Sequence, residues 1–114
     1  MEKELIEWND FSKIDMRVGT IIDVKINKKT NKPAYIIWID FGFLGIKKTS
    51  AQITNLYSPS ELTGQQVIAV LNFPPKQIAD MKSEVLLLGA VSEENSDVIF
   101  VKPERNVQNG LKIG

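Results

Sequence analysis

The stretch VIAVLNFPPKQIADMKSEVLLLG occupies residues 67–89, and the rest of the chain can be arranged around it. Two runs with strand character, residues 67–73 and 84–88, flank the ten residues 74–83. The two consecutive prolines lack backbone donors and fix φ at about −65°, so we expect the chain to leave the sheet at Pro74. Ten residues exceed what a tight hairpin turn needs, and this segment mixes charged with apolar side chains. The pattern predicts a long binding loop rather than a hairpin.

Strand patterns also lie on both sides of this stretch. Residues 16–26 alternate with a period of two, which predicts a half-buried strand, and Gly19 within them suggests a bend or bulge. Residues 34–41 are almost continuously apolar, which is typical of a strand covered on both faces. The remaining expected strands are short and cover residues 46–49, 84–91 and 97–101.

Helical signals are brief. Ser58-Pro59-Ser60-Glu61 has the form of a capping box with proline at the first helical position, and Gly64 ends this helix within about two turns. Ser50, just before residues 51–53, suggests another single turn. Five principal strands with a helical crossing between the third and the fourth predict an all-β fold, a five-stranded oligonucleotide/oligosaccharide-binding (OB) barrel with short helical turns.

Terminal extensions are expected on a single domain of residues 1–114. The C-terminal extension covers residues 102–114, and the N-terminal one, residues 1–15, is expected to be helical. Its apolar residues recur every three positions: Leu5, Trp8, Phe11 and Ile14. So short a helix is unstable alone, so we expect its apolar side to pack on the barrel. A second subunit is the alternative, because tryptophan is enriched at interfaces.

Composition excludes several classes of protein. The 114 residues include no cysteine and no histidine, which removes disulfides, thiolate nucleophiles and the commonest metal ligands. No phosphate-binding or nucleophile motif is present, so we expect a non-enzymatic protein without cofactor or metal. Neither a bilayer-spanning apolar run of about 20 residues nor a signal peptide is found, so a cytoplasmic location without membrane insertion is expected.

Charge is balanced overall but unevenly distributed. There are 14 basic and 14 acidic residues, yet residues 25–48 hold six lysines and one acidic residue. Such a basic face attracts phosphate. Lysines beside an edge strand are the alternative interpretation, because they oppose unwanted strand pairing.

Aromatic residues close to these lysines are a second nucleic-acid signal. Single-strand binders combine a basic groove with rings on which bases stack. The candidate rings are Tyr35, Trp38, Phe41 and Phe43. Stacking requires them to face outward, whereas the unbroken apolar run favours core packing for most of them.

Apolar residues around the proline pair suggest a different ligand. A protein that binds unfolded polypeptide needs exposed apolar pockets, and methionine suits such surfaces because it repacks easily. The candidate peptide-binding residues are Phe73, Ile78, Ala79 and Met81. Burial of these residues in a dimer interface is the alternative.

Three stretches resemble one known family: IDMRVGTI (residues 14–21), IDFGFLGIKKTSAQIT (39–54) and NFPPKQIADMKSEVLLLG (72–89). With the closing NGLKIG (109–114), they resemble the CsaA family of secretion-related chaperones. These chaperones are relatives of the tRNA-binding OB domain appended to bacterial methionyl-tRNA synthetases. The resemblance covers nearly the whole chain from Phe11 onward.

The resemblance implies a homodimeric OB barrel without catalysis that binds unfolded or export-bound polypeptide. The alternative it implies is a structure-specific tRNA-binding protein. Matching positions of the tRNA-binding relatives, together with the lysine loop, give the expected tRNA-binding residues: Lys28, Lys29, Lys32, Asn72, Lys76, Ser83 and Leu86. Three positions depart from the tRNA-binding pattern: Ile36 replaces a frequent lysine, Asp80 a frequent glycine, and Leu86 the usual methionine.

Overall fold

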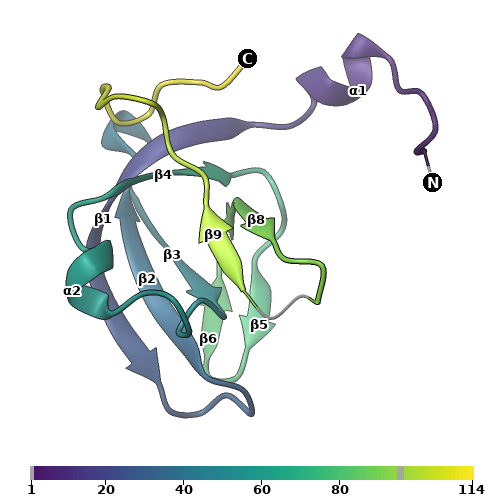
Figure 1. Ribbon diagram of the computed structural model, residues 1–114. Helices are drawn as coiled ribbons and strands as arrows, with labels where there is room; N and C mark the ends of the chain where they lie inside the picture. Colours follow the sequence, from purple (N-terminus) through teal and green to yellow (C-terminus); the bar gives the residue numbers. More distant parts are fainter. Residues whose placement is uncertain (1, 95–96) are drawn as a thin grey trace.

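Figure 1 shows a computed structural model of the protein, which describes residues 2–94 and 97–114. In chain order its elements are α1 (Trp8–Ser12), β1 (Met16–Asn27), β2 (Ala34–Asp40), the 3-10 turn η1 (Gly42–Leu44), β3 (Ile46–Ala51), α2 (Pro59–Leu62), β4 (Gln66–Val70), β5 (Lys76–Ile78), β6 (Met81–Ser83), β7 (Leu86–Leu87), β8 (Gly89–Val91) and β9 (Val98–Phe100).

The main sheet is antiparallel and curls into a half-barrel. Its strand order is β3-β2-β1-β4-β7, so β3 and β7 form its two edges. Two small hairpins, β5–β6 and β8–β9, complete the structure. The predicted all-β, OB-like fold with five principal strands is confirmed, as is the short helix between the third and fourth strands.

The long strand β1 bends at a bulge where its register to β2 shifts between Ile21 and Asp23. Before the bulge, Gly19 and Ile21 face the core, since a Cβ on Gly19 would lie 2.5 Å from Cγ2 of Ile39 and Ile21 is fully buried. After the bulge, Val24 and Asn27 are buried. A single alternating face over residues 16–26 is therefore wrong, because the extra residue exchanges the two faces.

The helix α2 forms as its sequence predicts. The Glu61 N–H donates to the Ser58 hydroxyl at 3.4 Å, and the Ser58 N–H donates to Oε1 of Glu61 at 2.9 Å. Hydrogen bonds that Ser58 donates to the Glu61 carboxylate, first from its backbone N–H and then from its hydroxyl, lower the pKa of the Glu61 carboxyl. The helix places Leu62 fully inside the core.

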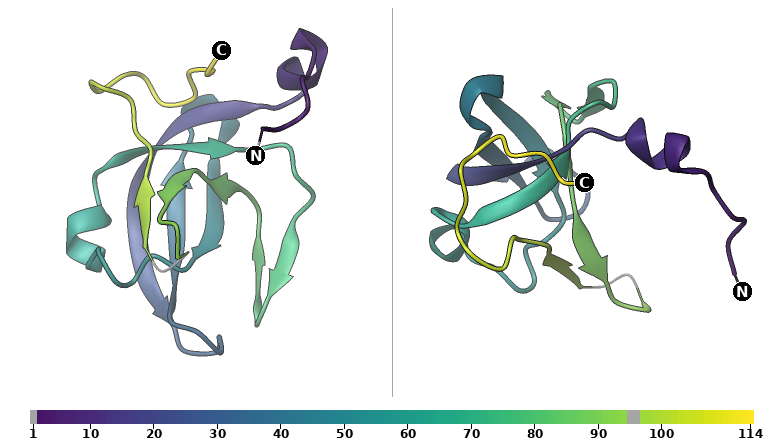
Figure 2. Two further views of the ribbon diagram at one scale, coloured as in Figure 1. Left: turned by 45° about the vertical axis from the view of Figure 1, so that its right-hand side comes forward. Right: turned by 90° about the horizontal axis from the view of Figure 1, so that it is seen from above.

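Residues 74–83 contain a hairpin, so their prediction as a long loop is wrong. β5 pairs with β6 from Lys76↔Ser83 to Ile78↔Met81, and Ala79 in the turn has a φ of 53°. The prolines end the preceding strand, but the chain pairs with itself directly after them. In Figure 2 (left) this hairpin lies beside the curled sheet.

Other strand boundaries also differ from the prediction. The strand expected over residues 67–73 ends at Val70, and the one expected over 84–91 is divided into β7 and β8. β3 continues to Ala51, so Ser50 lies within a strand and caps no helical turn. The predicted last strand forms as β9, which pairs with β8.

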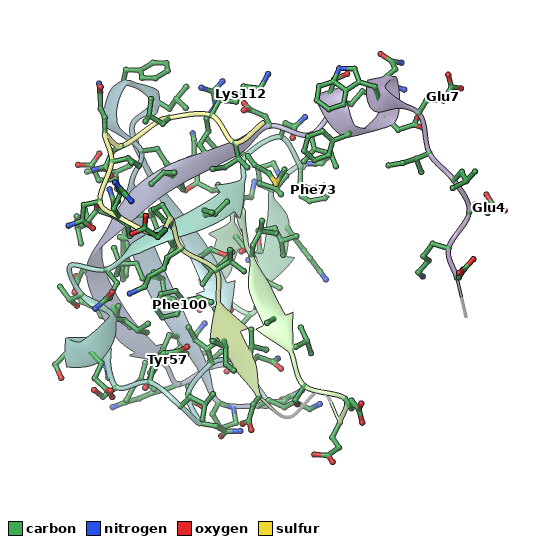
Figure 3. The ribbon with its side chains drawn as sticks, turned by 45° about the horizontal axis from the view of Figure 1, so that its top comes forward. Glu4, Glu7, Tyr57, Phe73, Phe100 and Lys112 are labelled. Carbon is green, nitrogen blue, oxygen red and sulfur yellow. The ribbon has the colours of Figure 1, made fainter. Side chains whose placement is uncertain are left out.

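The N-terminal segment stands away from the barrel, as the views in Figures 1 and 2 show. In Figure 3, Glu4 and Glu7 mark its detached course. None of the described residues of α1 is buried, and Leu5 and Trp8 are 100% and 72% exposed. The expected packing of this segment on its own barrel is therefore wrong.

The C-terminal segment lies across the start of β1. The Val18 N–H donates to the Leu111 carbonyl at 3.0 Å, and the Gly110 N–H donates to the Val18 carbonyl at 2.7 Å. Since β1 pairs with β2 only from Thr20 onward, this segment extends the ladder where β2 has ended.

Candidate functional site

A hollow of about 480 Å³ lies between the β5–β6 hairpin and the β3 and β7 edges, and we call it the hairpin groove. Its lining residues are Thr49, Ser50, Phe73, Pro74, Lys76, Ile78, Ser83, Glu84, Val85 and Leu86. The groove therefore brings β3 together with most of the stretch that organises the sequence.

Ser83 holds the hairpin against the edge of β3. Its hydroxyl oxygen accepts the Ser50 N–H at 3.0 Å and lies 3.0 Å from the Thr49 hydroxyl. Thr49 in turn donates to the Val85 carbonyl at 2.8 Å. These side-chain bonds replace a regular ladder at this edge.

Glu84 makes the neighbouring connection. Its N–H donates to the Lys48 carbonyl at 2.8 Å, and its Oε1 accepts the Lys48 N–H at 3.0 Å. Glu84 alone therefore bonds to both backbone groups of Lys48.

Two of the four predicted peptide-binding residues line the groove. Phe73 is 55% exposed and Ile78 is half-buried on its wall. Ala79 instead lies at the hairpin tip, and Met81 is only 6% exposed in the core. Met81 is therefore not on the groove surface, because the pleat of β6 turns it inward.

Three of the predicted tRNA-binding residues share the same groove, namely Lys76, Ser83 and Leu86. Leu86 is 48% exposed. The groove thus combines residues that the sequence assigns to two different ligands.

Asn72 lies outside the groove. Its side-chain carbonyl accepts the Asp15 N–H at 2.9 Å, and its amide donates to the Lys13 carbonyl at 2.6 Å. The Asn72 side chain therefore braces the chain where the N-terminal segment enters β1.

The lysines of the β1–β2 loop are exposed and reach the hairpin tip. Lys29 Nζ lies 3.5 Å from Oδ2 of Asp80, an exposed ion pair that contributes little stability. Lys29 and Lys32 line a separate hollow of about 430 Å³ with Ala79, and Lys28 is exposed beside it in the sequence.

Of the four candidate stacking rings, two are in the core. Tyr35 and Phe41 are buried, whereas Trp38 is half-buried and Phe43 is 77% exposed. Lys25 places Nζ 5.7 Å from the Trp38 ring centroid, a cation–π contact. Lys25 belongs to the lysine-rich segment that the sequence shows. Its contact with Trp38 could not be predicted, because it depends on the register between β1 and β2.

A further hollow of about 380 Å³ lies between residues 50–53 and residues 86–89, and we call it the seam hollow. Val91 and Val98 complete its lining, and it shares Ser50 and Leu86 with the hairpin groove. Sequence reasoning missed it, since the two sheet edges meet only through the curl of the sheet.

Within the described residues, no cluster of three or more acidic side chains that could hold a metal ion occurs. No helix in the same part of the chain has the length and apolarity needed to cross a membrane.

Comparison with known proteins supports a binding module. The family model described as a putative tRNA binding domain matches residues 16–112. The methionine–tRNA ligase of Pyrococcus horikoshii is 36% identical over 112 residues, which are 98% of this chain and 15% of that protein. The chain thus spans about 15% of the length of such curated relatives.

Solved structures of similar chains include two chaperones. The crystal structure of chaperone CsaA from Bacillus anthracis str. Ames matches with a TM-score of 0.92 and 46% identity, over 97% of this chain and 100% of that one. The CsaA chaperone protein from Picrophilus torridus matches with a TM-score of 0.89 and 50% identity, over 96% and 100%. The chain therefore belongs to the putative tRNA-binding domain family, as a member that resembles CsaA chaperones over nearly its whole length.

Proposed function

We propose that this protein is a non-enzymatic, CsaA-like chaperone that binds unfolded or export-bound polypeptide in the hairpin groove. The observation that carries the proposal is the exposure of Phe73 and Leu86 on the walls of a hollow of about 480 Å³. Large apolar side chains gathered around a hollow are typical of a binding surface. Lys76 and Ser83 add polar groups to the same groove. An unfolded polypeptide needs such groups because its backbone N–H and C=O groups require hydrogen-bond partners.

The test replaces both exposed apolar walls, in the double variant Phe73→Ser, Leu86→Ser. We expect it to lose most of its ability to suppress aggregation of a chemically unfolded model enzyme, because the client loses its apolar contacts. Ile26→Ser is the matched control, since Ile26 is also exposed but lines none of the hollows described above. Equal suppression by the double variant and the wild type would refute this site.

Met81→Asp is a poor choice for this experiment. The substitution places a carboxylate at a buried position, so it tests folding rather than binding.

We also propose a homodimer, in which a second copy covers the N-terminal segment. Leu5, Ile6 and Trp8 are exposed together on a segment whose helix of five residues is too short to be stable alone. Burial against another subunit would stabilise it. We expect a dimer in sedimentation at micromolar concentrations and a shift toward monomer for Trp8→Glu. Leu56→Glu, at an exposed leucine outside the segment, should leave the dimer intact. A monomeric wild type would refute the proposal.

A second candidate function is tRNA binding. It is supported by the family model and by a surface on which Lys25 covers Trp38 close to the exposed lysine loop. tRNA and newly made polypeptide both occur in the cytoplasm, where we place the protein.

Salt dependence tests this candidate. The logarithm of the tRNA association constant should fall with the logarithm of salt concentration, with a slope of about −0.7 to −0.9 for each phosphate contact. Lys28→Ala with Lys32→Ala should reduce that slope, whereas Lys3→Ala on the acidic segment should not. No complex at micromolar protein and low salt would exclude tRNA as the ligand.

A further inference from the structure

We propose that polypeptide binds this chain by strand addition, as an extended segment that pairs with the free edge of β7 at Leu87. Its alternate side chains then enter the hairpin groove and the seam hollow. This inference rests on the proposed chaperone function and specifies the conformation in which the ligand is held.

The two edges of the sheet are joined at one end only. Glu84 donates its N–H to Lys48, and Thr49 donates its hydroxyl to Val85. Past these contacts no strand pairing joins β3 to β7 among the residues that the structure describes. The seam hollow occupies this interval, so the edge of β7 borders an open space of about 380 Å³.

The hydrogen-bond pattern shows which backbone groups face this space. The Leu88 N–H donates to the Ile68 carbonyl of β4 at 3.0 Å, and Ala69 lies opposite Leu87. Neighbouring residues of a strand direct their backbone groups to opposite sides. Leu87 therefore turns both its N–H and its C=O away from β4 and into the seam.

On the opposite wall of the seam, formed by β3, a backbone donor is already hydrogen-bonded. The Ser50 N–H of β3 donates to the Ser83 hydroxyl rather than to a backbone carbonyl. Within the described residues no bond from another element reaches the Leu87 N–H or C=O, so these groups are the better template for a new strand.

The two hollows suit alternate side chains of an extended chain. They share Ser50 and Leu86, so they adjoin along the seam. In an extended strand, residues i and i+2 lie on one face roughly 7 Å apart. A helical ligand satisfies its own backbone groups and would leave those of Leu87 unmatched.

The lining residues define the side chains that fit. Phe73 and Ile78 line the hairpin groove, and Ile53 and Val91 line the seam hollow, so aliphatic residues are expected at alternate positions. One basic and one acidic residue, Lys76 and Glu84, line the groove, so we expect no strong charge preference beside the aliphatic positions.

The test uses a fluorescent heptapeptide with leucine at alternate positions and serine between them. Two N-methylated forms are compared, one methylated at the leucines and one at the serines. Only one set of N–H groups faces the β7 edge, so we expect one form to bind at least tenfold more weakly and the other to stay within about twofold of the parent peptide. Exchange of the Leu87 amide hydrogen should slow by at least tenfold when the parent peptide is bound.

A protein variant checks the location independently. Val91→Lys, in the seam hollow, should weaken binding of the parent peptide by about tenfold. Ile26→Lys, at an exposed isoleucine on β1, should leave it within about twofold.

Each other outcome overturns the proposal in a distinguishable way. Equal affinity of the two methylated forms would show that strand addition is wrong while peptide binding stands. No binding of any peptide, together with no suppression of aggregation, would remove the proposed function as well. The Leu87 amide could also be protected from hydrogen exchange without any peptide, at protein concentrations where dimers form. In that case a second copy of the chain occupies the seam, and the proposal fails.

Discussion

Removal of the Ser83 hydroxyl should detach the β5–β6 hairpin from the edge of β3. In Ser83→Ala, the Ser50 N–H loses its acceptor and the Thr49 hydroxyl loses one of its three hydrogen-bonding contacts. The family resemblance assigns Ser83 to ligand binding, whereas these contacts give it a structural role. Measuring the free energy of unfolding without ligand separates the two roles, because only the structural role changes it.

The expected magnitude follows from these two contacts. A net hydrogen bond contributes about 0.5–1.5 kcal/mol, so the two together contribute about 1–3 kcal/mol. Thr49 keeps its bond to the Val85 carbonyl, and the Ser50 N–H lies at a sheet edge that water can reach. We therefore expect the free energy of unfolding to fall by about 1–2 kcal/mol.

Denaturant unfolding measures this loss, and amide exchange locates it. Exchange at the Ser50 amide should accelerate by about five- to thirtyfold, as a loss of that size implies. Ser60→Ala, which removes an exposed hydroxyl on α2 that lies 3.2 Å from the Ser58 hydroxyl, is the control and should change stability by less than about 0.5 kcal/mol. An unchanged unfolding midpoint with unchanged Ser50 exchange would refute the structural role.

Three other substitutions test the scaffold around the groove. Gly19→Ala should lower the unfolding free energy by about 1–3 kcal/mol in denaturant titrations, since the new Cβ would lie 2.5 Å from Ile39; an unchanged midpoint would contradict the tight packing. Asn72→Ala should cost about 1–2 kcal/mol and speed proteolysis of the N-terminal segment, because two backbone bonds are lost. Glu61→Gln should be less stable than the wild type at neutral pH. Because Ser58 lowers the Glu61 pKa in the folded state, this difference is present above the ordinary glutamate pKa and disappears as pH falls through the lowered value; a pH-independent difference would contradict the charge-based cap.

Local pattern was sufficient for much of the fold. The capping box at Ser58 and Glu61 predicts α2, because its bonds join residues three positions apart. Apolar runs predict most strands, since the pattern acts within a few residues, and the proline pair predicts that the fourth strand ends before Pro74, although β4 already stops at Val70. The family resemblance was likewise readable from the sequence and agrees with the overall similarity to the two CsaA structures.

Predictions failed where the backbone departs from its commonest geometry. The β5–β6 turn uses Ala79 at a positive φ, and no glycine or asparagine there signals a tight turn. The β1 bulge lies beyond Gly19, between Ile21 and Asp23. The predicted alternation of buried and exposed residues therefore changes phase within the strand, which the period-two pattern did not indicate. The expected packing of the N-terminal helix failed because periodicity identifies an apolar side but not the surface that covers it.

The candidate site itself depends on tertiary structure. Sequence by itself determined that Phe73, Lys76, Ser83 and Leu86 lie in one unusual stretch. Only the curl of the sheet placed them against β3, through bonds such as Thr49 to Ser83 that join residues 34 positions apart. Pairing of β7 with β4 likewise turns the backbone of Leu87 toward the seam. Contacts of this range arise from the closure of the whole sheet, so no local pattern of side chains could specify them.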